Sequence, residues 1–284
     1  STVNGDLAVD GGTASNAGTV TGAASVAAGA TLANSGAVTG AVTNAGTTTN
    51  SGTTGAVSTG GTFTNALGAT VNGALTVTGG TTANAGRVTG NLDAQGGTTT
   101  STGQIDGTAR VRTGATATSS GAIEGLATVD AGGTFTNAGR IGSAGTPAGV
   151  TTAGRFTNAS GGTVFGPLAV NGDQTVNSGT VNGAVSVAAG ARLDNGGTIT
   201  GAVTNDGIFN GLGGGSAGVV TNRATATNAG TVAGLVNQAP GTFDNSGTIT
   251  GTADVQGGTL TNSGAVGGLT TVAAGATVTN SGRL

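Results

Sequence analysis

The chain has 284 residues, a formal net charge of −3 and only 7% charged residues; 61 residues are Gly, and Cys, His, Met, Trp and Tyr are absent. So much Gly disfavours helix, whereas the abundant Thr and Val favour strands, so we expect an all-β fold. No basic run points to a nucleic-acid partner, and no apolar run approaches the roughly 20 residues that span a bilayer.

A short phrase repeats from one end of the chain to the other. It is Asn-x-Gly, with an apolar residue two positions before the Asn and a β-branched or aliphatic one four positions after it, as in 32–38 and 243–249. Aligning on the Asn gives sixteen repeats at intervals of 15 to 21 residues. Two repeats hold Ser101 and Ser119 instead, and the others hold Asn16, Asn34, Asn50, Asn65, Asn84, Asn137, Asn158, Asn177, Asn195, Asn210, Asn228, Asn245, Asn262 and Asn280.

Apolar residues recur about every six positions within these repeats. The step is clear at Val20, Val26, Leu32 and Val38 near the start, through 105–141 in the middle, and again at Val266, Val272, Val278 and Leu284. Three such steps make one coil, so residues 1–284 are predicted to form a single three-sided parallel β-helix (β-solenoid). It would have about sixteen coils of about 18 residues. A right-handed coil is favoured over a left-handed hexapeptide solenoid, because the residue after each aliphatic one is often Thr or Ala and the intervals vary.

The repeated Asn residues are predicted to be structural. They share parity with the apolar positions, which places them inside the coil or at a corner. Stacked amides can donate and accept hydrogen bonds along such a column, satisfying one another where water is excluded. We therefore expect an Asn ladder along one corner and no ligand on it.

Sequence motifs for chemistry are nearly absent. Without His, Cys or Lys there is no Ser-His-Asp triad, zinc site or P-loop, so no catalytic, metal or cofactor site is predicted and the chain is not expected to be an enzyme. The segment 213–218 matches a nucleophile elbow and a dinucleotide fingerprint, but such matches arise by chance in a Gly-rich stretch. Asp6 with Asp10, and Arg110 with Arg112, are each placed on one face and interpreted as solvated charges.

Two other features leave alternatives open. The regions 142–174 and 211–222 break the period, and loops on a rigid scaffold often carry specificity, although insertions without function explain them as well. Thr pairs such as Thr19/Thr21 and Thr248/Thr250 would match an ice lattice if they stacked in register, but Arg87 and Arg140 interrupt the same columns.

The phrases at 259–264 (Thr-Leu-Thr-Asn-Ser-Gly), 248–251 (Thr-Ile-Thr-Gly) and 272–277 (Val-Ala-Ala-Gly-Ala-Thr) resemble repeats of bacterial autotransporter passenger domains and of filamentous-haemagglutinin-type adhesins. The resemblance implies a right-handed β-helix displayed on the outer-membrane surface of a Gram-negative bacterium. It also implies a role in adhesion, aggregation or biofilm formation.

The function expected on this basis is that of a rigid extracellular surface rod, as a segment of a longer surface protein. Its partners would be other copies of itself, host or surface receptors, or polysaccharide, with no nucleic acid and no transmembrane segment in this chain. Two alternatives are a subunit that assembles head to tail into an extracellular filament, since an uncapped solenoid end invites strand addition, and an ice-binding β-solenoid.

Overall fold

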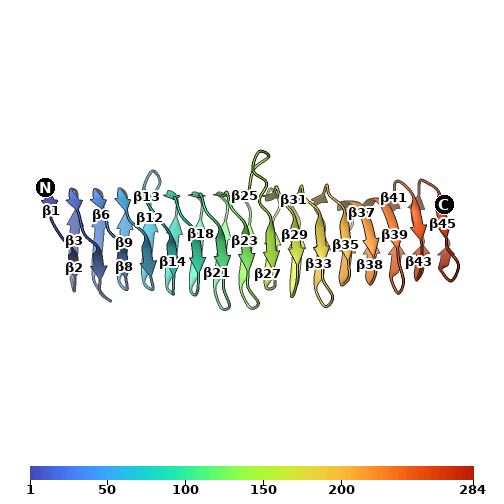
Figure 1. The fold of residues 1–284 in the computed structure, drawn as a ribbon, viewed down its shortest axis with the longest axis horizontal. Helices are drawn as coiled ribbons and strands as arrows, with labels where there is room; N and C mark the ends of the chain where they lie inside the picture. The colour runs from blue at the N-terminus through green and yellow to red at the C-terminus, as the bar shows by residue number, and fades with distance from the viewer. The chain divides into compact units, whose positions relative to one another are not determined.

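The computed structural model describes residues 1–284, all of which lie in short β-strands or in the turns between them. The chain divides into two compact units, Ser1–Ser143 and Ala144–Leu284. Both are built from one repeating coil, and Figure 1 shows that within each unit the strands lie side by side, coil after coil. The predicted all-β parallel solenoid of about sixteen coils is confirmed, with eight four-residue strands in each unit. Its handedness and its behaviour as a single domain stay predictions.

Each coil of the first unit contributes one strand to each of three stacks. The wide sheet consists of β3 (Thr13–Asn16), β6 (Thr31–Asn34), β9 (Thr47–Asn50), β12 (Thr62–Asn65), β15 (Thr81–Asn84), β18 (Thr98–Ser101), β21 (Thr116–Ser119) and β24 (Thr134–Asn137). The second stack consists of β1 (Thr2–Val3), β4 (Thr19–Val20), β7 (Ala37–Val38), β10 (Thr53–Thr54), β13 (Thr70–Val71), β16 (Arg87–Val88), β19 (Gln104–Ile105), β22 (Ala122–Ile123) and β25 (Arg140–Ile141). The third stack consists of β2 (Leu7–Val9), β5 (Ala24–Val26), β8 (Val42–Asn44), β11 (Val57–Thr59), β14 (Leu75–Val77), β17 (Leu92–Ala94), β20 (Ala109–Val111) and β23 (Ala127–Val129).

The second unit repeats this plan. Its wide sheet consists of β27 (Arg155–Asn158), β30 (Gln174–Asn177), β33 (Arg192–Asn195), β36 (Ile208–Gly211), β38 (Thr225–Asn228), β40 (Thr242–Asn245), β43 (Thr259–Asn262) and β46 (Thr277–Asn280). Its second stack consists of β28 (Thr163–Val164), β31 (Thr180–Val181), β34 (Thr198–Ile199), β41 (Thr248–Ile249) and β44 (Ala265–Val266). Its third stack consists of β26 (Val150–Thr152), β29 (Leu168–Val170), β32 (Val185–Val187), β35 (Val203–Asn205), β42 (Ala253–Val255) and β45 (Thr270–Val272). Two seven-residue strands, β37 (Ser216–Asn222) and β39 (Thr231–Asn237), run through the corner and join both of these stacks.

Within each unit, strands pair in parallel with their equivalents in the neighbouring coil, so residues at equivalent positions meet. In the wide sheet Leu32 pairs with Thr48 and Asn34 with Asn50. Along most four-residue strands the second and fourth residues are buried and the first and third face outward, as at 47–50 and 98–101. The inward residues of all three strands meet in one narrow core of Val, Leu, Ile, Ala and Phe.

The six-residue apolar step predicted these inward positions in the body of both units. Val20, Val26, Leu32 and Val38 are each at most 2% exposed. Val272 has the same register position as the buried Val255 but is 52% exposed, and Leu284 is 53% exposed. They lie in the last coil described, where no further coil packs over them.

Glycine has two different roles in the coil. Gly29 lies in an open turn with a φ of +82°, a conformation that L-residues with a side chain rarely adopt. Gly36, the last residue of an Asn-x-Gly phrase, does not have a positive φ. A Cβ on Gly36 would lie 2.0 Å from the carbonyl oxygen of Gly18 in the previous coil, so the close stacking of coils excludes any side chain there.

A few hydroxyl groups in the core have no hydrogen-bond partner. The second position of the wide strands, usually Leu, Phe or Ala, is Thr82 and Thr99 in two consecutive coils, and both side chains are buried. Neither Oγ1 makes a hydrogen bond. By contrast, the equivalent Thr48 donates its hydroxyl to Asn44 Oδ1 at 3.0 Å.

Replacing either unpartnered threonine by the isosteric valine is expected to stabilise the fold. Thr82→Val and Thr99→Val should each raise the free energy of unfolding by about 1 kcal/mol, because a buried unsatisfied hydroxyl costs about that much or more. The measurement is the urea midpoint of the β-sheet circular dichroism signal. Thr48→Val is the matched control and should lower the midpoint, since it breaks a buried hydrogen bond. Equal shifts in all three variants would contradict the assignment.

Candidate functional site

A ladder of asparagine side chains runs along one corner of the coils in the first unit. Each amide occupies the fourth position of a wide strand. From Asn16 to Asn65, each one donates to the Asn one coil further on. Asn34 Nδ2, for example, lies 2.8 Å from Asn50 Oδ1, and Asn50 Nδ2 lies 2.8 Å from Asn65 Oδ1. The Asn34 amide also donates to the carbonyl oxygen of Thr53 at 2.9 Å, at the start of the next strand in the second stack. One side chain therefore joins both strands that flank the corner.

The predicted stacked amides are confirmed. In addition to the contacts above, hydrogen bonds of 2.7–2.8 Å join Asn16 to Asn34, Asn65 to Asn84, Asn158 to Asn177, Asn177 to Asn195, Asn228 to Asn245, Asn245 to Asn262, and Asn262 to Asn280. Asn137 donates to the carbonyl of Gly139 at 3.2 Å. Of the two serines, Ser101 accepts from Asn84 at 3.1 Å, whereas the Ser119 hydroxyl is buried without a partner.

The placement of Asn210 in this ladder is wrong. The register pairs Asn195 with Gly211 and Gly211 with Asn228, so a glycine occupies the ladder position. The physical reason is the burial of Phe209, which is fully enclosed, while Ile208 faces outward and is 40% exposed. Shifting the strand by one residue would exchange the two faces and expose the larger side chain. Because Gly211 has no side-chain amide, Asn228 Oδ1 is left without a donor.

A second, shorter ladder was missed by the sequence analysis. It lies at the end of the third stack, where Asn205 donates to Asn222 at 2.7 Å and Asn222 to Asn237 at 2.8 Å. In the first unit Asn44 donates to the hydroxyl of Thr59 at 3.0 Å at the equivalent position. Additional Asn-x-Gly phrases at 44–46 and 205–207 were the available signal.

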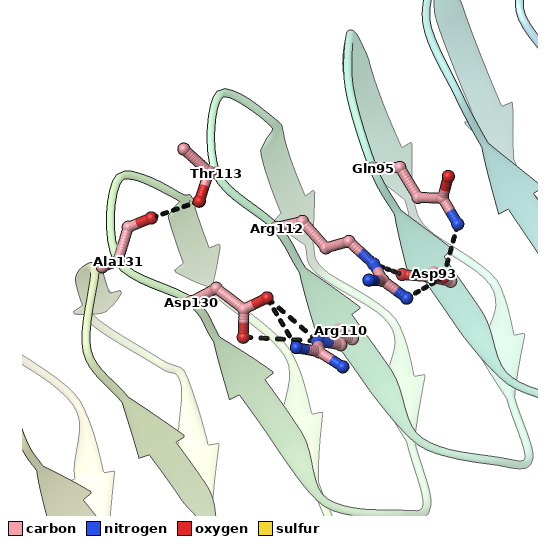
Figure 2. Close-up of polar contacts among 7 residues, drawn as sticks. All are labelled: Asp93, Gln95, Arg110, Arg112, Thr113, Asp130 and Ala131. Carbon is pink, nitrogen blue, oxygen red and sulfur yellow. Dashed lines mark hydrogen bonds and ion pairs between the residues drawn. The ribbon is translucent and has the colours of Figure 1, made fainter.

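Ion pairs on the outer surface also join neighbouring coils. Figure 2 shows Arg110 turned toward Asp130 in the following coil, at 2.9 Å, and Arg112 toward Asp93 in the preceding coil, at 2.8 Å. The two arginines therefore act in opposite directions along the stack rather than forming one basic site. The hydrogen bond from Arg112, assisted by Gln95 and opposed by partial burial, lowers the pKa of Asp93.

Other exposed pairs follow the same pattern. Arg87 contacts Asp106 at 2.6 Å, Arg223 contacts Asp206 at 3.4 Å, and Arg140 contacts Glu124. The arginine side chains in these pairs are 40–57% exposed, so solvent screens each pair and its contribution to stability is small.

The most enclosed carboxylate belongs to Asp194, on the outer side of the wide sheet in the second unit. It accepts hydrogen bonds from Asn210 at 2.7 Å, from Arg192 at 2.9 Å and from Gln174 at 2.5 Å. Burial raises the pKa of Asp194, but these hydrogen bonds outweigh it and the net shift is downward. The pKa of Asp254 is lowered as well, by hydrogen bonds from Thr271 and Gln256. Carboxylates held ionised in this way are poor general acids at neutral pH.

The remaining sequence candidates have structural surroundings. Asp6 accepts the backbone N–H of Ala23 at 2.7 Å in the next coil, and Asp10 lies exposed after β2. In the motif at 213–218, residues 213–215 lie in a turn and residues 216–218 begin β37, with no helix after it. In the region 142–174 only the segment between β25 and β26 leaves the coil, as a loop exposed at residues 144–147 (Figure 1).

No group of three or more acidic, His or Cys side chains is arranged to hold a metal ion. No helix of sufficient length and hydrophobicity to cross a membrane is present.

Comparison with known proteins gives limited information about this chain. No family model matches it, and no curated protein matches it. Among solved structures, the crystal structure of a TibC-catalysed hyper-glycosylated fragment of TibA aligns with a TM-score of 0.47 and 18% sequence identity, covering 100% of this chain and 99% of the fragment.

Breaking the Asn ladder at its centre is expected to destabilise the coil strongly. Asn65→Ala removes one amide that accepts from Asn50 and donates to Asn84, leaving a buried donor and a buried acceptor unpaired. Each unpaired buried group costs about 1–3 kcal/mol, so the free energy of unfolding should fall by about 3 kcal/mol. Urea unfolding measures this loss. Asn72→Ala, at an exposed turn, is the control and should change the midpoint little. Similar losses in both variants would contradict a structural ladder.

The hydrogen bonds to Asp194 predict a loss of stability in acid. Because its folded-state pKa lies below the unfolded value of about 3.9, the stabilisation is present above that pH and is lost as the pH falls through the folded pKa. Asp194→Asn should therefore be less stable than wild type at pH 7, by about 1 kcal/mol, and should lose less stability between about pH 5 and pH 2. Thermal unfolding across pH measures this. Asp244→Asn, at an exposed carboxylate on the same sheet, should lose stability in acid as wild type does.

Proposed function

We propose that the chain is a rigid segment of a bacterial surface adhesin, a passenger-type β-helix that lies outside the cell and supports adhesion, aggregation or biofilm formation. The observation that carries the proposal is the use of the polar side chains. Buried amides and surface ion pairs alike contact the neighbouring coil, as Asn50 does inside and Arg112 outside. In an enzyme, amide, arginine and carboxylate side chains often bind or transform a substrate, whereas here they bind one coil to the next.

Such fastening favours stiffness. Each coil is held by backbone hydrogen bonds on three sides, and a ladder amide adds two further bonds at a corner. Opening one coil would break all of these together and leave buried amides unpaired, which makes local opening costly. A segment of this kind resists bending without any disulfide, and the chain contains no Cys.

The contact surfaces in this proposal are the outward side chains of the coils and the exposed loop at 144–147. Their partners would be other copies of the chain, receptors on a host or on another cell, or surface polysaccharide. Catalysis is not part of the proposed role, and the downward pKa shifts of Asp93, Asp194 and Asp254 support this.

Display of the chain on the outer membrane of a non-adherent bacterium tests the proposal. Cells that carry the chain on an anchor should settle and attach to surfaces faster than cells that carry the anchor alone, and purified chain added in excess should reduce the effect. No difference from anchor-only cells would contradict an adhesive role. Electron microscopy of the purified chain checks the filament alternative, since filaments that lengthen with concentration would favour head-to-tail assembly instead.

A further inference from the structure

The outer surface of the wide sheet in the first unit is composed almost entirely of threonine. Between β9 and β24 it presents twelve outward positions, two on each of six strands. We call this surface the threonine face. Its residues are Thr47, Thr49, Thr62, Thr64, Thr81, Ala83, Thr98, Thr100, Thr116, Thr118, Thr134 and Thr136.

These residues form two columns in strict register. The first runs from Thr47 through Thr62, Thr81, Thr98 and Thr116 to Thr134, and the second starts at Thr49 and ends at Thr136 with Ala83 as its one interruption. Adjacent strands lie about 4.8 Å apart and alternate residues of a strand about 6.6 Å apart, so the face is a repeating two-dimensional grid.

The hydroxyl groups of this grid are available for hydrogen bonds to a binding partner. All twelve residues are exposed or half-buried, and none of the eleven hydroxyls makes a hydrogen bond within the protein. Thr is β-branched, so its χ1 angle has few accessible states on a strand and each hydroxyl and methyl group is held in a narrow range of positions. The face also contains no charged residue.

The fold by itself does not demand threonine at these positions. In the second unit the equivalent outward positions include Arg155, Gln174, Val176, Arg192 and Asp194. The same coil therefore accepts charged, amide and aliphatic side chains there, and the uninterrupted threonine face is a property of the first unit.

The threonine pairs singled out from the sequence are not part of this face. Thr21 and Thr250 lie at corners after β4 and β41, where their hydroxyls contact the carbonyl oxygens of Val3 and Val232 at 3.3 and 3.4 Å. The column of Thr19 is also broken by Ala37 and by Arg87. Those pairs do not form an ordered surface array.

We propose that the threonine face binds ice, through a layer of ordered water held by its hydroxyl and methyl groups. A crystalline water surface is the partner that repeats in two directions as this grid does. Moving a charged side chain from liquid water to an ice surface, which cannot solvate it, is costly. An ice-binding surface should therefore lack charged residues, as the threonine face does. Sugar or peptide recognition commonly uses aromatic side chains or charged anchors, and this face has neither. This function is independent of the adhesive role.

Measurements of the ice activity of the purified full chain test the proposal directly. Wild-type chain should inhibit ice recrystallisation and produce thermal hysteresis, whereas an equal concentration of serum albumin should not. Thr98→Lys places a long cation between Thr81 and Thr116 and should reduce the activity at equal concentration by at least about tenfold, because an ammonium group is not accommodated at an ice surface.

Thr43→Lys is the matched control, since Thr43 is an exposed outward threonine of the third stack in the same unit. It should retain full activity, and circular dichroism should show both variants folded as the wild type is. A wild-type chain without ice activity would overturn the proposal, as would equal losses in the two lysine variants. Neither result would affect the adhesion test, which measures the settling and attachment of cells in liquid medium.

Discussion

The parallel, in-register hydrogen bonding of each coil to the next is the constraint on which the rest of the structure depends. It places each paired strand residue beside the residue at the same position of the neighbouring coil, as Asn34 lies beside Asn50. A side chain is therefore tolerated only where it can stack on its equivalent or where the neighbour leaves room. The sequence repeats because the coil imposes the same neighbours at each turn.

This constraint explains how polar groups are accommodated in so narrow a core. An amide offers both a donor and an acceptor, so a column of asparagines satisfies itself, whereas a column of hydroxyls does so less well, as the unpartnered Thr82 and Thr99 show. The same constraint selects glycine at Gly36, where the carbonyl of the previous coil occupies the space of a side chain. Outside, it brings opposite charges one coil apart, as in Arg110 and Asp130.

Outward positions are under weaker constraint, and there the two units differ. The wide sheet of the first unit presents the threonine face, while that of the second contains Arg192 and Asp194 joined to Gln174 and Asn210. The same scaffold thus supports a neutral, repetitive surface in one unit and a charged hydrogen-bonded cluster in the other. Any difference in partners between the units would arise from these side chains, since their backbone plan is shared.

The sequence by itself determined the all-β solenoid, its three strands per coil and most of the Asn ladder, because a buried position must recur with the period of the coil. The prediction from sequence failed where two strand registers were both compatible with the repeat pattern. Asn210 matched the motif, but the burial of Phe209 decided the position of the strand. Only the tertiary structure revealed the second ladder at Asn205 and Asn222, the stacking role of Gly36 and the alignment of the threonine face. These depend on which residues meet across coils of unequal length, and intervals of 15 to 21 residues do not specify that register.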